Sequence, residues 1–199
     1  IQASELQDKG VLANCHVNVL QTQDHPQFKT YAEELKWLTT DSTRMTWVAN
    51  TIKDISTSGN TLILVDRISA GEILNKKLKD SVFISGSTKN LERKEHYDEV
   101  STTQNKIIIA TYGVASVGIN IPRIFNLVLI EPGKSFVRVI QSIGRGIRKA
   151  EDKENVQIWD ITSSCKFAKR HLGARKKFYK EANYPYNIEK INYENPYTR

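Results

Sequence analysis

The sequence predicts a doubly wound α/β domain, in which helices cover both faces of a parallel β-sheet. Apolar runs of strand length alternate along the chain with stretches of helix length, and the connections between them are short. Most of these runs are apolar at consecutive positions, which is typical of parallel strands buried on both faces. Ligands of such sheets bind beyond the carboxyl ends of the strands, so the loops that follow the strands are the first places to look for a site.

In the first half of the chain, the pattern begins after an irregular stretch. Residues 1–30 show little periodicity, and only the alternation at 17–20 allows a short strand there. Asp41 can cap a helix, because apolar residues recur at helical spacing from Met45 until Ser58-Gly59-Asn60 breaks the pattern. The elements expected next are a strand at 61–65, a helix from Ser69, a short strand at 82–84 and a polar helix at 89–101.

The second half continues the alternation. The expected elements are a strand at 106–110, a loop at 111–124, a strand at 125–130, a helix from Ser135 to about Arg148, a strand at 156–161 and a long basic helix from Ser163 to about Ala182. The stretch from 184 to 199 holds four tyrosines and two prolines and is expected to be a loosely docked tail.

Composition excludes several classes of protein. With 39% hydrophobic residues, the 199-residue chain can bury a core, which argues against wholesale disorder. Its apolar runs are far shorter than the ~20 residues that span a bilayer, so no membrane partner is expected. The two cysteines, Cys15 and Cys165, exclude a disulfide scaffold and a cysteine zinc site. We therefore expect no metal site, and the reducing cytosol (a cytoplasmic location) is the expected compartment.

The positive charge is concentrated in one part of the chain. The net charge is +7, and the stretch from Lys134 to Lys180 holds 13 basic and four acidic residues. The remainder is slightly acidic. A local basic excess favours a polyanionic partner, which can be a phosphate, a nucleic acid or a membrane surface. The alternative is a solvated helix with Lys and Arg on its outer face.

The segment Gln141-Ser142-Ile143-Gly144-Arg145-Gly146-Ile147-Arg148 carries the most chemical information. Gln141, Arg145 and Arg148 share one face of the expected helix, and apolar residues from Phe136 onward occupy another. Guanidinium groups match phosphate oxygens and stay charged at any working pH, so a pair of them can neutralise charge on a transferring phosphoryl group. The alternative is two surface arginines paired with nearby carboxylates.

A second segment joins the strand at 106–110 to a glycine-containing loop. Thr111 is delivered to the carboxyl edge of the sheet, where its hydroxyl suits a phosphate. Gly118 allows close approach of a ligand to the backbone, and Asn120 can hydrogen-bond a ribose or orient an arginine. An ordinary connection between two strands is the alternative.

Several complete active sites are missing from the sequence. It has no G-x-x-x-x-G-K-[ST] phosphate loop, no G-x-G-x-x-G after a strand, no H-E-x-x-H and no G-x-S-x-G. Any phosphate chemistry must therefore be shared with another domain or chain.

Four segments of the sequence resemble motifs of superfamily 2 helicases, and they occur along the chain in the order that the family has. Residues 108–122 resemble motif V, and residues 141–148 resemble motif VI. Residues 62–66 look like motif IV, and 84–87 with Glu92-Arg93 look like the strand–glycine–helix element that follows it. The resemblance spans residues 61–148 and implies a RecA-like second helicase domain at 41–162. Residues 1–40 are then a linker leading in from a preceding domain, and 163–199 form a C-terminal basic helix and tail.

The resemblance also implies roles for residues near the nucleotide. Arg148 matches the arginine finger of motif VI, and Arg145 matches the preceding arginine, so both are expected to be catalytic and ATP-binding. Gln141, Gly118 and Asn120 match ATP-binding positions. Many relatives carry Asp where this chain has Asn120.

Other matched positions belong to the nucleic-acid track. Thr111 matches the motif V threonine that touches the nucleic-acid backbone, and Gly86 and Arg67 lie where strand-tip loops approach the same nucleic-acid strand.

The function implied is that of a C-terminal motor domain of an ATP-dependent DNA helicase that unwinds branched DNA or drives branch migration. ATP and Mg²⁺ are then bound mainly by an N-terminal RecA-like domain of the same protein, so this chain alone is expected to be inactive. DNA is the expected partner, with RNA left open. One alternative is a RecA-like module that binds nucleic acid without catalysis; another is an unrelated α/β fold that binds a small phosphorylated ligand.

Overall fold

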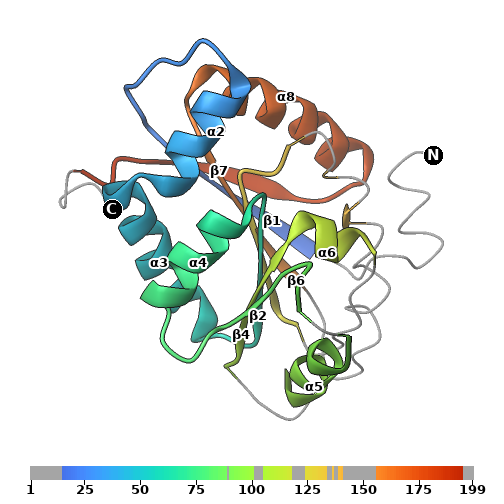
Figure 1. The fold of residues 1–199 in the computed structure, drawn as a ribbon. Coiled ribbons are helices and arrows are strands. Elements are labelled where there is room, and N and C mark those ends of the chain that lie inside the picture. The colour runs from blue at the N-terminus through green and yellow to red at the C-terminus, as the bar shows by residue number, and fades with distance from the viewer. Residues whose placement is uncertain are drawn as a thin grey trace.

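The computed structural model describes residues 15–88, 90–100, 105–117, 124–133, 136, 139–140 and 156–194. In this part of the chain, one seven-stranded sheet has the order β3-β4-β2-β5-β6-β1-β7 (Figure 1), and every pairing is parallel. The strands are β1 (Cys15–Thr22), β2 (Thr61–Val65), β3 (Val82–Ile84), β4 (Ile107–Thr111), β5 (Asn126–Ile130), β6 (Val156–Ser163) and β7 (Tyr186–Ile191). The helices are α2 (Tyr31–Thr40), α3 (Ser42–Ser56), α4 (Ile68–Lys77), α5 (Asn90–Val100), α6 (Tyr112–Ser116) and α8 (Lys166–Glu181).

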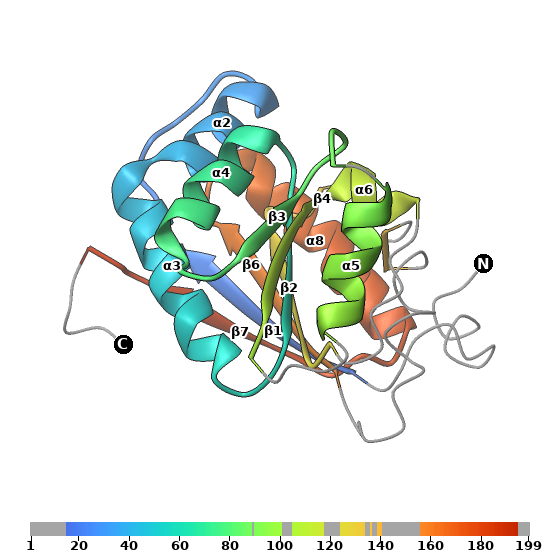
Figure 2. The ribbon, with the colours of Figure 1, turned by 60° about the horizontal axis from the view of Figure 1, so that its bottom comes forward.

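Two apolar cores lie on opposite faces of the sheet. Along β2, Ile63 and Val65 point into the core that α3 and α4 cover, whereas Leu62 and Leu64 point into the core of α6 and α8. Figure 2 shows the same layering, with α3 and α4 on one side of the strands and α5, α6 and α8 on the other. This explains why the central strands are apolar at consecutive positions, and the predicted doubly wound architecture is confirmed.

The first strand is longer than its sequence pattern predicted. The expected strand at 17–20 is β1, which extends from Cys15 to Thr22 and lies between β6 and β7. A polar residue hid its first end: His16 Nε2 lies 2.7 Å from Asn187 Oδ1 of β7. Within the strand, Asn18 donates from Nδ2 to Gln157 Oε1 of β6 at 3.1 Å. Polar side chains that bond across strands interrupt an apolar pattern without interrupting the strand.

The prediction of a loosely docked tail from residue 184 was wrong in its first part. Tyr186–Ile191 forms β7, which pairs in parallel with β1 at the edge of the sheet. Its four central side chains are exposed, so no apolar run marks it. Helices α2 and α6 were also missed. The boundaries expected at residues 40 and 163 stay predictions, and within the described ranges no helix is long and apolar enough to cross a membrane.

Candidate functional site at the carboxyl ends of the strands

The chain changes the direction in which it crosses the sheet between β2 and β5. After β2 it passes through α4 to β3, whereas after β5 it continues to β6 on the opposite side. β2 and β5 are hydrogen-bonded neighbours. The loops that follow them, Asp66–Arg67 and Glu131–Gly133, therefore border the position at which doubly wound sheets bind ligands.

A buried arginine holds Glu131 from the α3 side of the sheet. Arg44 is fully buried in the first turn of α3, and its Nη2 donates to Glu131 Oε1 at 2.7 Å. Its Nε donates to Thr22 Oγ1 at 3.1 Å and lies 3.7 Å from Asp24. Thr162 donates to the other Glu131 oxygen at 3.2 Å. Burial raises the pKa of Glu131 to about 7, although the Arg44 guanidinium acts in the opposite direction.

A second buried arginine reaches the same loop from α8. Arg175 donates from Nε and Nη2 to the two oxygens of Asp160, at 2.8 and 2.9 Å, and from Nη1 to the Pro132 carbonyl. Tyr179 donates to Asp160 Oδ2 at 2.7 Å. Burial raises the pKa of Tyr179 well above its usual range, so the phenol stays protonated and keeps donating. The Asp160 carboxylate in β6 is thus buried with three donors around it.

Together the two arginines fix the backbone that follows β5. Arg44 holds the Glu131 side chain on one face of the sheet, and Arg175 holds the Pro132 carbonyl on the other. Further on, Phe136 and Ile140 are buried, and the Phe136 ring lies edge-on to the Tyr179 ring, with 5.5 Å between the ring centres. Residues 141–148 follow directly on this anchored segment.

The residues predicted to face the nucleotide cannot be placed. Gly118, Asn120, Gln141, Arg145 and Arg148 lie outside the described residues. Their roles stay predictions.

The three residues predicted to contact nucleic acid follow the carboxyl ends of three adjacent strands. Arg67 follows β2, Thr111 ends β4 and Gly86 follows β3. The strand register pairs Val65 of β2 with Thr111 of β4, and Ile84 of β3 with Ala110 of β4. The fold therefore brings these three positions to one stretch of the sheet edge.

Local interactions leave these three positions open to a ligand in different ways. Thr111 caps α6, and its Oγ1 accepts from Val114 N at 3.2 Å, which leaves the hydroxyl hydrogen to donate outward. Arg67 is one-third exposed and pairs through Nε with Asp66 at 2.9 Å. Gly86 is exposed, and a Cβ there would meet open space, so packing does not require a glycine and the backbone stays approachable.

Sequence reasoning missed the buried ionic groups that fix the site. One signal was available: Asp160 is a carboxylate that interrupts the apolar run from Ile158 to Ile161, which calls for a buried partner. Its partner Arg175 lies in a basic helix and could not be told from the surface cations around it. Asp66 Oδ1 is a further buried oxygen, and it has no hydrogen-bond partner among the described residues.

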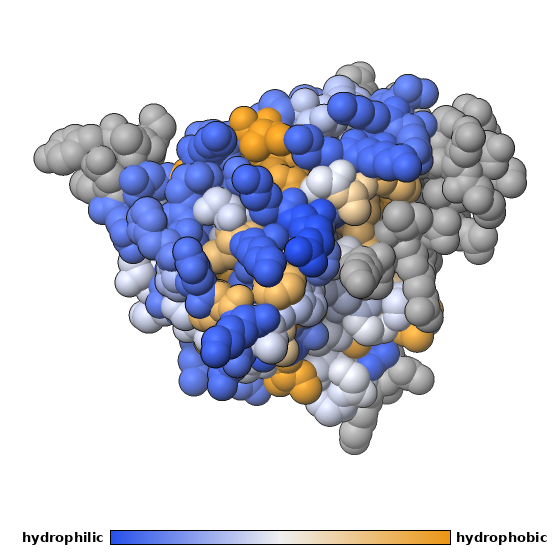
Figure 3. All heavy atoms as spheres, turned by 90° about the horizontal axis from the view of Figure 1, so that it is seen from above, coloured by the Kyte–Doolittle hydropathy of each residue, from blue (hydrophilic) through white to orange (hydrophobic). Residues whose placement is uncertain are grey.

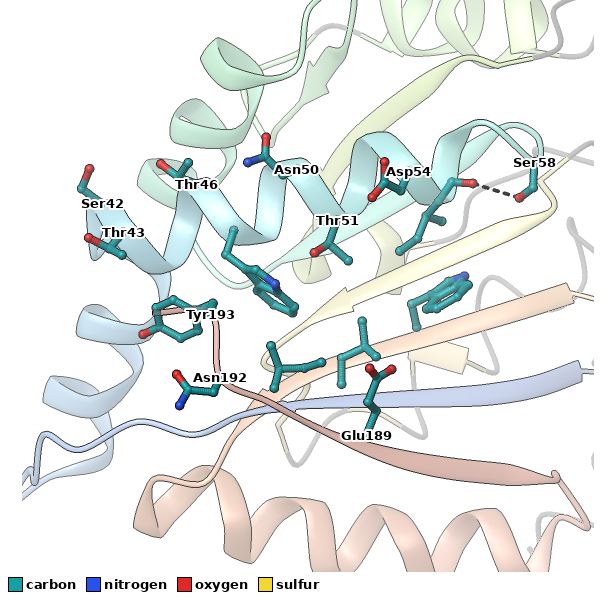
Figure 4. A pocket seen from close by; sticks show the side chains of 15 residues that line it. Ser42, Thr43, Thr46, Asn50, Thr51, Asp54, Ser58, Glu189, Asn192 and Tyr193 are labelled. Atoms are coloured by element: carbon teal, nitrogen blue, oxygen red, sulfur yellow. Dashed lines mark hydrogen bonds between the residues drawn. The ribbon is translucent and has the colours of Figure 1, made fainter. Parts of the chain in front are cut away.

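A groove of about 1110 Å³ lies elsewhere, between α3 and the outer strands β6, β1 and β7 (Figure 4). Trp47 and Trp159 contribute to its wall, and its carboxylates are Asp54 and Glu189. Among the residues that the structure describes, no Lys or Arg lines it, so it does not suit a polyanion. No group of three or more His, Cys, Asp or Glu in the described ranges could hold a metal ion.

Solved structures show which class of α/β domain this is. The crystal structure of T4 UvsW matches with a TM-score of 0.78 and 22% identity, covering 92% of this chain and 42% of that one. A fragment of a putative HsdR subunit of a type I restriction enzyme from Vibrio vulnificus matches with a TM-score of 0.70 and 17% identity, covering 97% of this chain and 39% of that one. The fold is the RecA-like fold of helicase C-terminal domains.

The sequence comparisons then give the family. The model of the helicase conserved C-terminal domain matches residues 43–150, and the chain belongs to this family. It is 28% identical over 189 residues to the ATP-dependent DNA helicase uvsW of Enterobacteria phage T4, which covers 89% of this chain and 38% of that protein. It is 31% identical over 104 residues to putative helicase 22 of a Sulfolobus islandicus filamentous virus, covering 50% and 18%. The chain thus spans less than half the length of these relatives.

Proposed function

We propose that this chain is the C-terminal motor domain of an ATP-dependent superfamily 2 DNA helicase. In the complete protein, a preceding RecA-like domain binds ATP, and this domain closes over the nucleotide. Family membership supports the proposal, and so does the anchored loop after β5. Because Arg44 and Arg175 fix Glu131 and Pro132, the segment that carries the motif VI arginines starts from a rigid base at the ligand-binding edge.

The chemistry assigned to this chain is charge neutralisation at a neighbouring domain's triphosphate. Arg145 and Arg148 supply permanent cations that match phosphoryl oxygens in two-point contacts. Gln141, Gly118 and Asn120 complete the nucleotide side. Mg²⁺, held by the preceding domain, supplies further charge neutralisation at the phosphates when bound.

The nucleic-acid side of the proposal uses the three adjacent strand ends. Arg67, Thr111 and Gly86 offer a guanidinium, a hydroxyl and exposed backbone N–H groups to one phosphate backbone, which gives binding that is independent of sequence and sensitive to salt. The T4 relative is described as an ATP-dependent DNA helicase. We extend this to DNA as the partner, and to branched DNA as the substrate of unwinding or branch migration.

The test is ATP hydrolysis by the complete protein, with and without DNA. DNA is expected to stimulate hydrolysis, and branched DNA is expected to stimulate it more than a linear duplex of equal length. Hydrolysis that no DNA stimulates, with DNA binding intact, contradicts the motor assignment and favours a module that only binds nucleic acid. Equal stimulation by linear and branched DNA contradicts only the branched-DNA part.

A further inference from the structure

We infer that the outer face of α8 is a second contact surface for the phosphate backbone of a nucleic acid, separate from the strand-end residues. The inference deepens the proposed function, since it names where a duplex arm is held. The α8 stripe comprises its five exposed cations, which are Lys166, Lys169, Arg170, Lys177 and Lys180.

The geometry of α8 separates the stripe from the core. The buried residues of α8 face the sheet and the core on the side of α6 and α8: Ala168, Leu172, Arg175, Phe178 and Tyr179. At 3.6 residues per turn, the five stripe cations fall within an arc of about 100° on the opposite side and extend over about 21 Å. Hydrophilic side chains dominate the face seen from above, the side on which α2 and α8 lie (Figure 3).

The stripe is not explained by the stability of α8 itself. Lys166 and Arg170 are i,i+4 neighbours of like charge, and Lys177 and Lys180 are i,i+3 neighbours, so each pair weakens the helix by a few tenths of a kcal/mol. The first turn of a helix also disfavours cations. The backbone N–H groups in the first turn of α8 already have a buried acceptor: Glu34 accepts from Phe167 N at 3.0 Å and from Ala168 N at 2.9 Å.

The stripe cations also lack ion-pair partners within the described residues. None of the five forms an ion pair there. Lys166 and Arg170 instead lie over the Phe167 ring, at 5.4 and 5.7 Å from its centre. A row of cations that repel each other and face solvent is stabilised by an external polyanion, whose neutralisation releases counterions.

Gly173 provides a second, independent observation. It lies exposed near the middle of α8, between the two groups of stripe cations. A glycine inside a helix costs about 1 kcal/mol relative to alanine. A Cβ at this position would meet nothing within 4 Å, so packing inside the protein does not require the glycine. Close approach of the phosphate backbone of a nucleic acid to the middle of the α8 stripe does account for the glycine.

The surroundings of α8 favour a nucleic acid over a membrane surface. A helix that lies on a membrane inserts an apolar face into the lipid. The apolar face of α8 is already buried against the core, so only cations are left outside.

The test uses the complete protein and a 40-base-pair DNA duplex, without ATP. The stripe variant Lys169→Gln/Arg170→Gln/Lys177→Gln is expected to bind at least tenfold more weakly at 0.1 M salt. The slope of log K against log [salt] is expected to fall by about two to three, at about 0.9 per lost phosphate contact. The control variant Lys53→Gln/Lys76→Gln/Lys79→Gln removes equal charge from exposed positions on the α3–α4 side and is expected to change neither quantity.

A pair of glycine variants tests the geometry without changing charge. Gly173→Gln is expected to weaken DNA binding strongly, and Gly173→Ala, which adds only a Cβ, is expected to weaken it less, although both favour the helix. The inference is overturned if the stripe variant keeps the wild-type slope, if both triple variants lose binding equally, or if the stripe is needed for binding phosphatidylserine vesicles but not DNA. None of these readouts involves ATP turnover, so failure of the motor assignment is seen separately.

Discussion

Removing the Arg175 guanidinium is expected to loosen the site from within. In Arg175→Met, the stem of the side chain is kept, but Asp160 loses two charge-assisted hydrogen bonds and the Pro132 carbonyl loses its donor. Asp160 is fully buried, and among the described residues only the Tyr179 hydroxyl still donates to it. Breaking a buried pair by removing one partner costs about 3–5 kcal/mol, a large part of a typical stability of about 5–15 kcal/mol.

Hydrogen exchange measures this loss in the complete protein. Each 1.4 kcal/mol is about tenfold in an equilibrium constant, so exchange of the β6 and α8 amides is expected to accelerate by about a hundredfold to several thousandfold. Lys176→Met is the control, because this neighbouring cation has no ion pair among the described residues. Arg175→Met/Asp160→Leu is expected to recover part of the loss, since no unpaired charge is left buried and the two groups that lose their partners, the Tyr179 hydroxyl and the Pro132 carbonyl, are neutral. Exchange within threefold of wild type in Arg175→Met refutes the reasoning.

Two further predictions concern carboxylates. The pKa of Glu131 is about 7 in the folded chain against an ordinary 4.5, so its contribution to stability is fully present below pH 4.5 and is lost as the pH rises through 7. When unfolding is followed across that pH range, Glu131→Gln is expected to lack this decline in stability. Parallel stability profiles of the variant and the wild type would show that Glu131 does not cause the decline. Glu34→Ala removes the acceptor for the first turn of α8 and is expected to cost about 0.5–2 kcal/mol of stability there. The loss is measured as faster hydrogen exchange of the Phe167 and Ala168 amides. An equal effect of Glu33→Ala, which removes an exposed neighbouring side chain, would contradict a specific capping role of Glu34.

Local sequence patterns predicted the elements that are apolar and repetitive. The strand at 61–65 and the short strand at 82–84 were predicted with their correct bounds, because β2 is fully buried and β3 is apolar at all three of its positions. The edge strand β7 was missed, because its sequence Tyr-Asn-Ile-Glu-Lys-Ile leaves most side chains exposed. Helix α6 was missed, because five residues are too few to show a period.

The residues of the candidate site also divide into those that the sequence could predict and those that it could not. Thr111, Gly86 and Arg67 could be predicted at the sheet edge because strand ends are visible in the sequence, and parallel pairing brings them together. The Arg44–Glu131 and Arg175–Asp160 pairs could not, because each joins a helix residue to a residue of the sheet or of the loop after it, and a buried arginine has the same letter as a solvated one. Their burial is a property of the assembled sheet.

The measurement that bears most directly on the motor assignment is the kcat for ATP hydrolysis of Arg148→Ala in the complete protein, at saturating DNA. An arginine finger contributes about 10³–10⁵ in kcat, so turnover is expected to fall by about a thousandfold or more, while DNA affinity without ATP stays within threefold of wild type. Lys53→Ala, at an exposed position on α3, is expected to leave both unchanged. Turnover of Arg148→Ala within threefold of wild type would contradict the account.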